Sequence, residues 1–292
     1  MERHGSHDVS QDHGHGPRRR GRLPDPARLL PALLVPAIFL TGLVPSLASA
    51  ASGDPSSVPV KTSRGEFSLL VYAPLEDRGL PPVLLVSGEG GWRRFDQSLA
   101  GHFRDAGHWV GGMDSLKYFW HPQDDRQALA GDVRAYAREL ARAAGRPEES
   151  ALILAGFSFG ADLAPWIAGA GGWGDRIAGL VMLGPDEVGS LQFRVLEVFG
   201  VDQKDHVFPV AEALASSKGI PLLFIHGGND PHSDAPPLFE KAPEPKRLLT
   251  VPGSDHHFSG HEEDLRKALG EGLAWLLRRD APAGPPKRGE RP

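Results

Sequence analysis

The stretch Ala151-Leu-Ile-Leu-Ala-Gly-Phe-Ser158-Phe-Gly-Ala-Asp-Leu163 indicates the fold of this chain. Its first five residues form an apolar run typical of a buried parallel strand, and its last three open a helical pattern. Between them lies Gly-Phe-Ser-Phe-Gly, whose glycines let a strand and a helix approach closely on either side of Ser158. A serine on so tight a turn points out of the sheet, as a nucleophile must. The alternative is a glycine-rich turn in which Ser158 only caps the helix.

Outward from this turn, strand and helix patterns alternate along the chain. Alternation of this kind predicts a mostly parallel sheet with helices on both faces. Together with the serine turn it predicts an α/β-hydrolase fold in a single domain, residues 51–278. The predicted strands are Phe67–Tyr72, Val83–Ser87, Trp109–Met113, Ala151–Ala155, Ile177–Leu183, Pro221–His226 and Arg247–Val251. The predicted helices are Phe95–Ala106, Asp124–Ala144, Phe159–Ala170, Val210–Ser216 and Glu262–Leu277.

A serine hydroxyl becomes a nucleophile only when an imidazole takes its proton and an acid orients that imidazole. In this fold the chain order is serine, acid, histidine. Asp230 follows one predicted strand, and His256 and His257 follow the last one, so these side chains are expected at the carboxyl edge of the sheet. We favour His256 as the base, because one residue separates it from the apolar anchor Phe258, and His257 is the alternative. The rival acids are Asp186 and Asp255, and Asp230 could instead be a turn former.

The oxyanion formed during ester cleavage needs hydrogen-bond donors. One is expected to be the backbone N–H of Phe159, which follows the nucleophile. The second is expected from the glycine-rich loop Ser87-Gly-Glu-Gly-Gly-Trp92, at Glu89 or Gly90. This loop lacks the Lys-Ser/Thr pair of a phosphate-binding P-loop, so a nucleotide site is not predicted.

Composition excludes several other classes of protein. The 292 residues contain 32 Lys and Arg against 37 Asp and Glu, a formal charge of −5, so counterion release offers little for nucleic-acid binding. The chain has no cysteine, which excludes disulfides, Cys-ligated metals and a Cys nucleophile. A Ser-His-Asp mechanism requires neither a metal nor a cofactor, and none is predicted.

The ends of the chain do not fit the domain pattern. Residues 1–50 contain a basic segment ending at Arg22, an uncharged apolar run from Leu29 to Leu47, and Ala48-Ser-Ala50, which predicts a cleaved secretory signal peptide. The alternative is a membrane anchor, since the run approaches the length of a span. Cleavage would leave 26 basic and 33 acidic residues, a formal charge of −7, in a periplasmic protein. Residues 279–292 are proline-rich and are predicted to be a disordered tail.

Several segments resemble the VirJ/AcvB family of periplasmic α/β-hydrolases, from about Val83 to Leu277. The chain has Glu89 where the family usually has Asp, and it lacks a cysteine pair common in the family's C-terminal half. The resembling segments are Ser87–Trp92, Gly112–Ser115 with Tyr118-Phe-Trp120, Gly156–Asp162 with Pro165, and Pro252–Phe258 with Gly260.

The resemblance implies a lysyl-phosphatidylglycerol hydrolase that cleaves an aminoacyl ester from an aminoacylated phospholipid at the membrane surface. It implies Ser158 as nucleophile, a base in the His256-His257 pair and Asp230 as acid. Carboxylates in the crevice would attract a cationic lysyl group. The candidate substrate-binding residues are Asp162, Trp92 and Tyr118, with Glu89, Asp114 and Asp186 as further carboxylates.

Two other functions are compatible with the same residues. One is a non-enzymatic periplasmic binding or assembly factor that contacts secretion-system proteins, since a fold does not fix a function. The other is a generic carboxylesterase with the same triad. Loss of activity in a Ser158→Ala variant would separate the enzymes from the binding factor.

Overall fold

The computed structural model describes residues 54–193 and 205–278. The predicted signal peptide, residues 1–50, and the predicted tail, residues 279–292, lie outside the described residues. None of the helices in the described part of the chain is both long enough and apolar enough for a membrane crossing.

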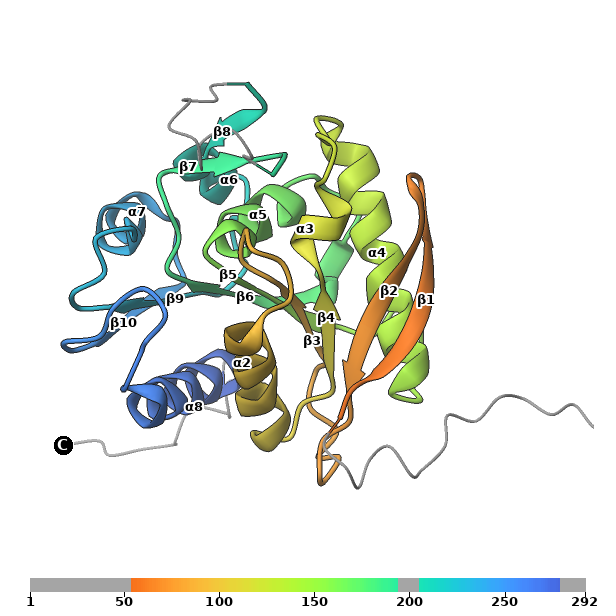
Figure 1. The fold of residues 1–292 in the computed structure, drawn as a ribbon, viewed down its shortest axis with the longest axis horizontal. Helices are drawn as coiled ribbons and strands as arrows, with labels where there is room; N and C mark the ends of the chain where they lie inside the picture. The colour runs from red at the N-terminus through yellow and green to blue at the C-terminus, as the bar shows by residue number, and fades with distance from the viewer. Residues whose placement is uncertain (1–53, 194–204, 279–292) are drawn as a thin grey trace, which may run out of the picture. The chain divides into compact units, whose positions relative to one another are not determined.

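An eight-stranded sheet forms the centre of the fold (Figure 1). The first two strands form a hairpin that pairs antiparallel with β4, and all other neighbours pair parallel. The mostly parallel sheet predicted from the sequence is therefore confirmed. The strands, in spatial order, are β1 (Ser56–Thr62), β2 (Gly65–Tyr72), β4 (Val110–Met113), β3 (Val83–Val86), β5 (Leu152–Phe157), β6 (Ile177–Leu183), β9 (Leu222–Gly227) and β10 (Lys246–Val251).

Helices cover both faces of the sheet, as predicted. On one face, α2 (Arg94–Asp105) and α8 (Glu262–Arg278) pack against one hydrophobic cluster. On the other face, a second cluster is covered by α4 (Arg126–Ala143), α5 (Phe159–Ala168), α6 (Val210–Ala215) and α7 (Ala235–Lys241). The remaining elements are α3 (Ser115–Tyr118), a 3-10 turn η1 (Gly174–Arg176) and the small hairpin of β7 (Val188–Ser190) and β8 (Val207–Pro209).

The sequence did not predict β1. Its residues alternate between exposed and partly buried, and Val60 is its only fully buried residue, so it lacks the continuous apolar run of the central strands. A buried carboxylate on α4 holds the tip of the hairpin. Asp132 accepts hydrogen bonds from the backbone N–H of Ser63 at 2.6 Å, from its hydroxyl at 2.8 Å and from the hydroxyl of Tyr118 at 2.6 Å. The hairpin therefore extends the sheet and belongs to its core.

Candidate active site

Ser158 lies on the turn between β5 and α5, at the centre of the sheet. Its backbone has φ 50° and ψ −118°. This conformation is unfavourable for any residue that has a Cβ atom, and such strained residues cluster at functional positions. A Cβ atom on Gly156 would collide with the backbone of Gly160, and one on Gly160 would collide with the carbonyl of Val86 on β3. The two glycines are therefore required by the close approach of α5 to β5 and β3, and Ser158 is left partly exposed.

An imidazole and a carboxylate meet in the loops that follow the two strands at one edge of the sheet. Asp230 follows β9, and its side chain is fully buried. Its Oδ2 lies 2.7 Å from Nδ1 of His256, which follows β10, and its Oδ1 accepts the backbone N–H of His232 at 2.8 Å. Backbone hydrogen bonds tie the two loops together, among them Asn229 N–H to the carbonyl of Ser254 at 2.9 Å. With Nδ1 engaged by Asp230, His256 has Nε2 available for a proton.

The other predicted acids and the other histidine occupy different environments. The ring of His257 packs against Phe95 and Phe157, with centroids 5.7 and 5.4 Å apart. Asp255 accepts backbone N–H groups of its own turn, and these hydrogen bonds lower its pKa. Burial and a contact with Asp234 raise the pKa of Asp186. The imidazole paired with a buried carboxylate is thus that of His256.

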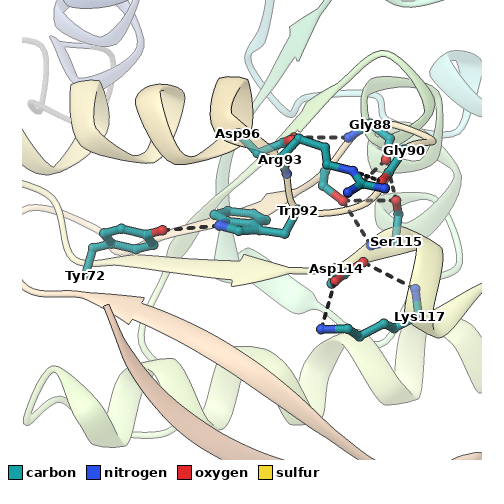
Figure 2. A network of polar contacts seen from close by, with 10 residues as sticks. Tyr72, Gly88, Gly90, Trp92, Arg93, Asp96, Asp114, Ser115 and Lys117 are labelled. Atoms are coloured by element: carbon teal, nitrogen blue, oxygen red, sulfur yellow. Dashed lines mark hydrogen bonds and ion pairs between the residues drawn. The ribbon is translucent and has the colours of Figure 1, made fainter. Parts of the chain in front are cut away.

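The loop of residues 87–93 carries the second predicted oxyanion donor. Asp96, in the first turn of α2, accepts the backbone N–H of Gly88 at 3.2 Å and that of Arg93 at 2.9 Å, so a single carboxylate holds both ends of the loop (Figure 2). Burial raises the pKa of Asp96, and these two hydrogen bonds oppose the rise. The Gly88 carbonyl in turn accepts the Ser115 hydroxyl at 2.5 Å. The loop is therefore fixed before any substrate arrives.

Sequence reasoning missed the role of Asp96. A carboxylate three residues after a helix N-cap is a known signal, because it can accept the N–H of the cap residue. Here the cap is Arg93 instead of the usual serine or threonine, so the pattern was incomplete. The predicted donor residues themselves lie near the nucleophile. Glu89 and Gly90 line one cavity with Ser158, and the N–H of Phe159, as the first residue of α5, has no partner within the helix.

The predicted substrate-binding residues divide into two groups. Asp162 is buried, lines a cavity with Ser158, and its Oδ1 accepts the backbone N–H of Asp186 at 2.8 Å. The structure does not bring the other two to the nucleophile. Tyr118 is 1% exposed in the core, where its hydroxyl donates to Asp132. Trp92 packs over Gly112 and donates to the hydroxyl of Tyr72 at 3.2 Å (Figure 2). The rings of Tyr118 and Trp92 therefore serve packing.

Two cavities diverge from Ser158 and His256, and both also contact Glu89. The first, which we call the acidic cavity, has a volume of about 300 Å³. Its other lining residues are Phe159, Asp162, Asp186, Val188, Ser190 and His232. The second has a volume of about 360 Å³ and is lined on its other sides by Gly88, Gly90, Gly91, Arg93, Arg94, Phe95, Asp96, Phe157 and His257. The acidic cavity thus carries three carboxylates and no arginine, whereas the second cavity carries two arginines beside the carboxylates of Glu89 and Asp96.

Solved structures with a similar fold are α/β hydrolases. A putative dienelactone hydrolase from Klebsiella pneumoniae subsp. pneumoniae MGH 78578 has a TM-score of 0.58 at 15% identity, covering 77% of this chain and 98% of that chain. Est1E from Butyrivibrio proteoclasticus has a TM-score of 0.56 at 14% identity, covering 76% and 99%. XC6422 from Xanthomonas campestris, described as an α/β serine hydrolase without a lid, has a TM-score of 0.52 at 24% identity, covering 80% and 97%.

These likenesses confirm the predicted α/β-hydrolase fold. No curated protein matches the chain. The family model of the bacterial virulence protein (VirJ) matches residues 82–275, a range that includes Ser158, Asp230 and His256. Because this match spans well over half of the sequence, the chain belongs to the VirJ family.

Proposed function

We propose that this protein is an exported serine hydrolase that cleaves a carboxylic ester, and that its substrate is the aminoacyl ester lysyl-phosphatidylglycerol. One observation carries the proposal. Ser158 stands in a strained turn and lines the same two cavities as His256, whose Nδ1 lies 2.7 Å from the buried carboxylate of Asp230. A nucleophile, a base and an orienting acid are the three groups that this chemistry needs.

The proposed reaction uses these groups in two steps. His256 takes the proton of the Ser158 hydroxyl at Nε2, and the serine oxygen bonds to the ester carbonyl carbon. The oxyanion accepts hydrogen bonds from the N–H of Phe159 and from the loop N–H of Glu89 or Gly90. The imidazolium then protonates the departing alcohol, and a water molecule, activated by His256 in the same way, releases the acyl group as a free acid.

The carboxylates of the acidic cavity support the proposal that the acyl group of the substrate is cationic. Asp162, Asp186 and Glu89 contribute carboxylates within a space of about 300 Å³ that includes the nucleophile. An ammonium group gains electrostatic attraction there that a neutral acyl chain does not. Lysyl-phosphatidylglycerol, the substrate implied by the family resemblance, presents two ammonium groups on its acyl side.

Lysine release from lysyl-phosphatidylglycerol in mixed micelles tests the proposal. The mature wild-type protein is expected to release lysine, and Ser158→Ala is expected to lose at least about 10³-fold in rate, as when a triad nucleophile is removed. Ser216→Ala is the matched control, because Ser216 is an exposed serine at the end of α6, and it should behave as wild type.

A fluorophosphonate probe that labels activated serines separates the ways in which the proposal can fail. Labelling of Ser158 without lysine release would keep the serine hydrolase and reject the lipid substrate. Neither labelling nor release would reject the enzyme and favour the binding or assembly factor.

A further inference from the structure

The arginine-bearing cavity next to Ser158 continues into a third cavity. The third cavity has a volume of about 500 Å³ and shares Arg94, Phe95 and His257 with the second one. Its other lining residues are Ser98, His102, Ser259, Glu262 and Leu265. We call the two cavities together the arginine groove. It leads from the nucleophile along α2 toward the start of α8.

The groove carries cationic side chains near its nucleophile end. Arg94 is exposed and lines both cavities of the groove. Arg93 is held beside it, because its Nε donates to the carbonyl of Gly90 at 2.7 Å (Figure 2). Guanidinium groups present several N–H donors in a plane and suit phosphate oxygens.

Carboxylates also line the groove, so its arginines offer hydrogen-bond donors within a lining that has little net charge. Asp96 is buried and engaged by the backbone of Gly88 and Arg93. Glu262 lies at the far end of the groove, where it accepts the backbone N–H of Gly260 at 3.2 Å. Glu89 is shared with the acidic cavity. The second cavity thus carries two arginines and two carboxylates, whereas the acidic cavity carries three carboxylates and no arginine.

The wall of the groove is apolar. Phe95 stacks on the buried ring of Phe258 at 6.1 Å and packs against Phe157 at 4.5 Å between centroids. Leu265 on α8 lies behind the third cavity and is only 1% exposed, so the partly exposed ring of Phe95 supplies the apolar surface. A groove with two arginines near the nucleophile and an aromatic ring beside them matches a ligand that is anionic near its ester bond and apolar farther away.

We propose that the arginine groove binds the alcohol half of the ester, with a phosphodiester against Arg93 and Arg94 and the adjoining apolar chain along Phe95 toward Leu265. This inference rests on the proposed function, because attack by Ser158 divides an ester into an acyl half and an alcohol half. The two halves extend from Ser158 in different directions. The two branches of the site differ correspondingly, because the acidic cavity carries three carboxylates and no arginine, whereas the groove carries two arginines beside its carboxylates. The acidic cavity takes the ammonium side and the arginine groove takes the phosphate side.

Binding of a soluble phosphatidylglycerol tests the inference without turnover. Dihexanoyl-phosphatidylglycerol is titrated by calorimetry into the Ser158→Ala protein, and into the same protein carrying Arg94→Ala or both Arg93→Ala and Arg94→Ala. We expect Arg94→Ala to weaken binding at least about tenfold and the double variant to weaken it further, as for lost charge-assisted hydrogen bonds. Arg78→Ala is the control, since Arg78 is an exposed arginine before β3 that pairs with Glu76.

Two further ligands identify what the groove recognises. Neutral dihexanoylglycerol should bind the parent and the arginine variants alike, because it lacks the phosphate. Inorganic phosphate should bind far more weakly than the lipid, because it cannot use the apolar wall. Equal affinity of free phosphate and lipid would overturn the lipid assignment, and equal binding of the lipid to all variants would overturn the role of the arginines.

The binding result and the proposed function can fail separately. Arginine-dependent lipid binding without lysine release would keep the groove and reject the proposed substrate. Ser158-dependent lysine release with no effect of the arginine variants on binding would keep the function and overturn the inference.

Discussion

The two halves of the candidate site are held in different ways. The nucleophile half, around Ser158, is fixed by backbone sterics, because Gly156 and Gly160 leave no room for a Cβ atom. The other half contains Asp230 and His256. It depends on the 2.7 Å contact between these two side chains, which lie 26 residues apart in the sequence. A local motif can thus determine the first half, whereas the second depends on how two distant strands align. Substitutions in the two halves should therefore have different consequences.

The largest effect on activity is expected in the side-chain half. Asp230→Asn should lower kcat about 10⁴-fold, as when the orienting acid of a serine triad is replaced by its amide and the histidine takes the wrong tautomer. The two side chains have nearly the same shape, so the melting temperature should change little. Ester hydrolysis and circular dichroism check the two parts of this expectation. A loss of less than tenfold would mean that another acid, such as Asp186, serves the base.

In the backbone half, stability and activity should fall together. Gly160→Ala places a Cβ atom against the carbonyl of Val86, and overpacking of this kind costs about 1–3 kcal/mol of unfolding free energy. Gly101→Ala is the matched control, because Gly101 lies within α2 with no atom near the new Cβ, and it should stabilise the protein by up to about 1 kcal/mol. Denaturant unfolding measures both changes. If Gly160→Ala lost activity without losing stability, backbone sterics would not be what holds the half of the site around Ser158.

The smallest effect is expected at the rim of the site. Asp186→Asn should raise the KM for a lysyl ester about two- to fivefold, the range for an exposed ion pair, and leave the KM of a neutral acetyl ester unchanged. Burial and the contact with Asp234 raise the pKa of Asp186, so it loses its negative charge at a higher pH than an ordinary aspartate. In the wild type, the KM for the lysyl ester should therefore rise as the pH falls through this raised pKa.

A second variant separates the two causes of that pKa shift. Asp234→Asn removes the neighbouring negative charge, so the pH at which KM rises should move downward. Its amide oxygen can still accept the backbone N–H of Glu187, which Asp234 accepts at 3.1 Å. An unchanged pH profile of KM in Asp234→Asn would leave burial as the sole cause of the raised pKa of Asp186.

The sequence predicted the parts of the fold that have a local signal. The central strands appeared as continuous apolar runs, and the predicted strand Ile177–Leu183 has the same bounds as β6. Chain order and position after a strand also led to Asp230 and His256. Edge strand β1 was missed because Val60 is its only fully buried residue.

Side-chain direction was harder to predict than position along the chain. Trp92 and Tyr118 adjoin the loops of the site in sequence, and only the structure shows that both rings turn into the core. The charge of the arginine groove was missed for the converse reason. Arg94 begins an ordinary amphipathic helix after the glycine-rich loop that was expected near Ser158, but the sequence does not show that its side chain lines the cavity.

The first turn of α2 carries two functions at once. Asp96 holds both ends of the proposed oxyanion loop, and Arg94, two residues earlier, lines the cavity proposed for the phosphate. If these proposed roles hold, a force that the bound alcohol exerts on Arg94 would be transmitted through this turn to the N–H donors proposed to stabilise the transition state. Helix α2 would act as a mechanical link, through which binding of the departing half of the substrate contributes to the chemical step as well as to affinity. An ester with a poorly fitting alcohol would then react slowly even when it is bound.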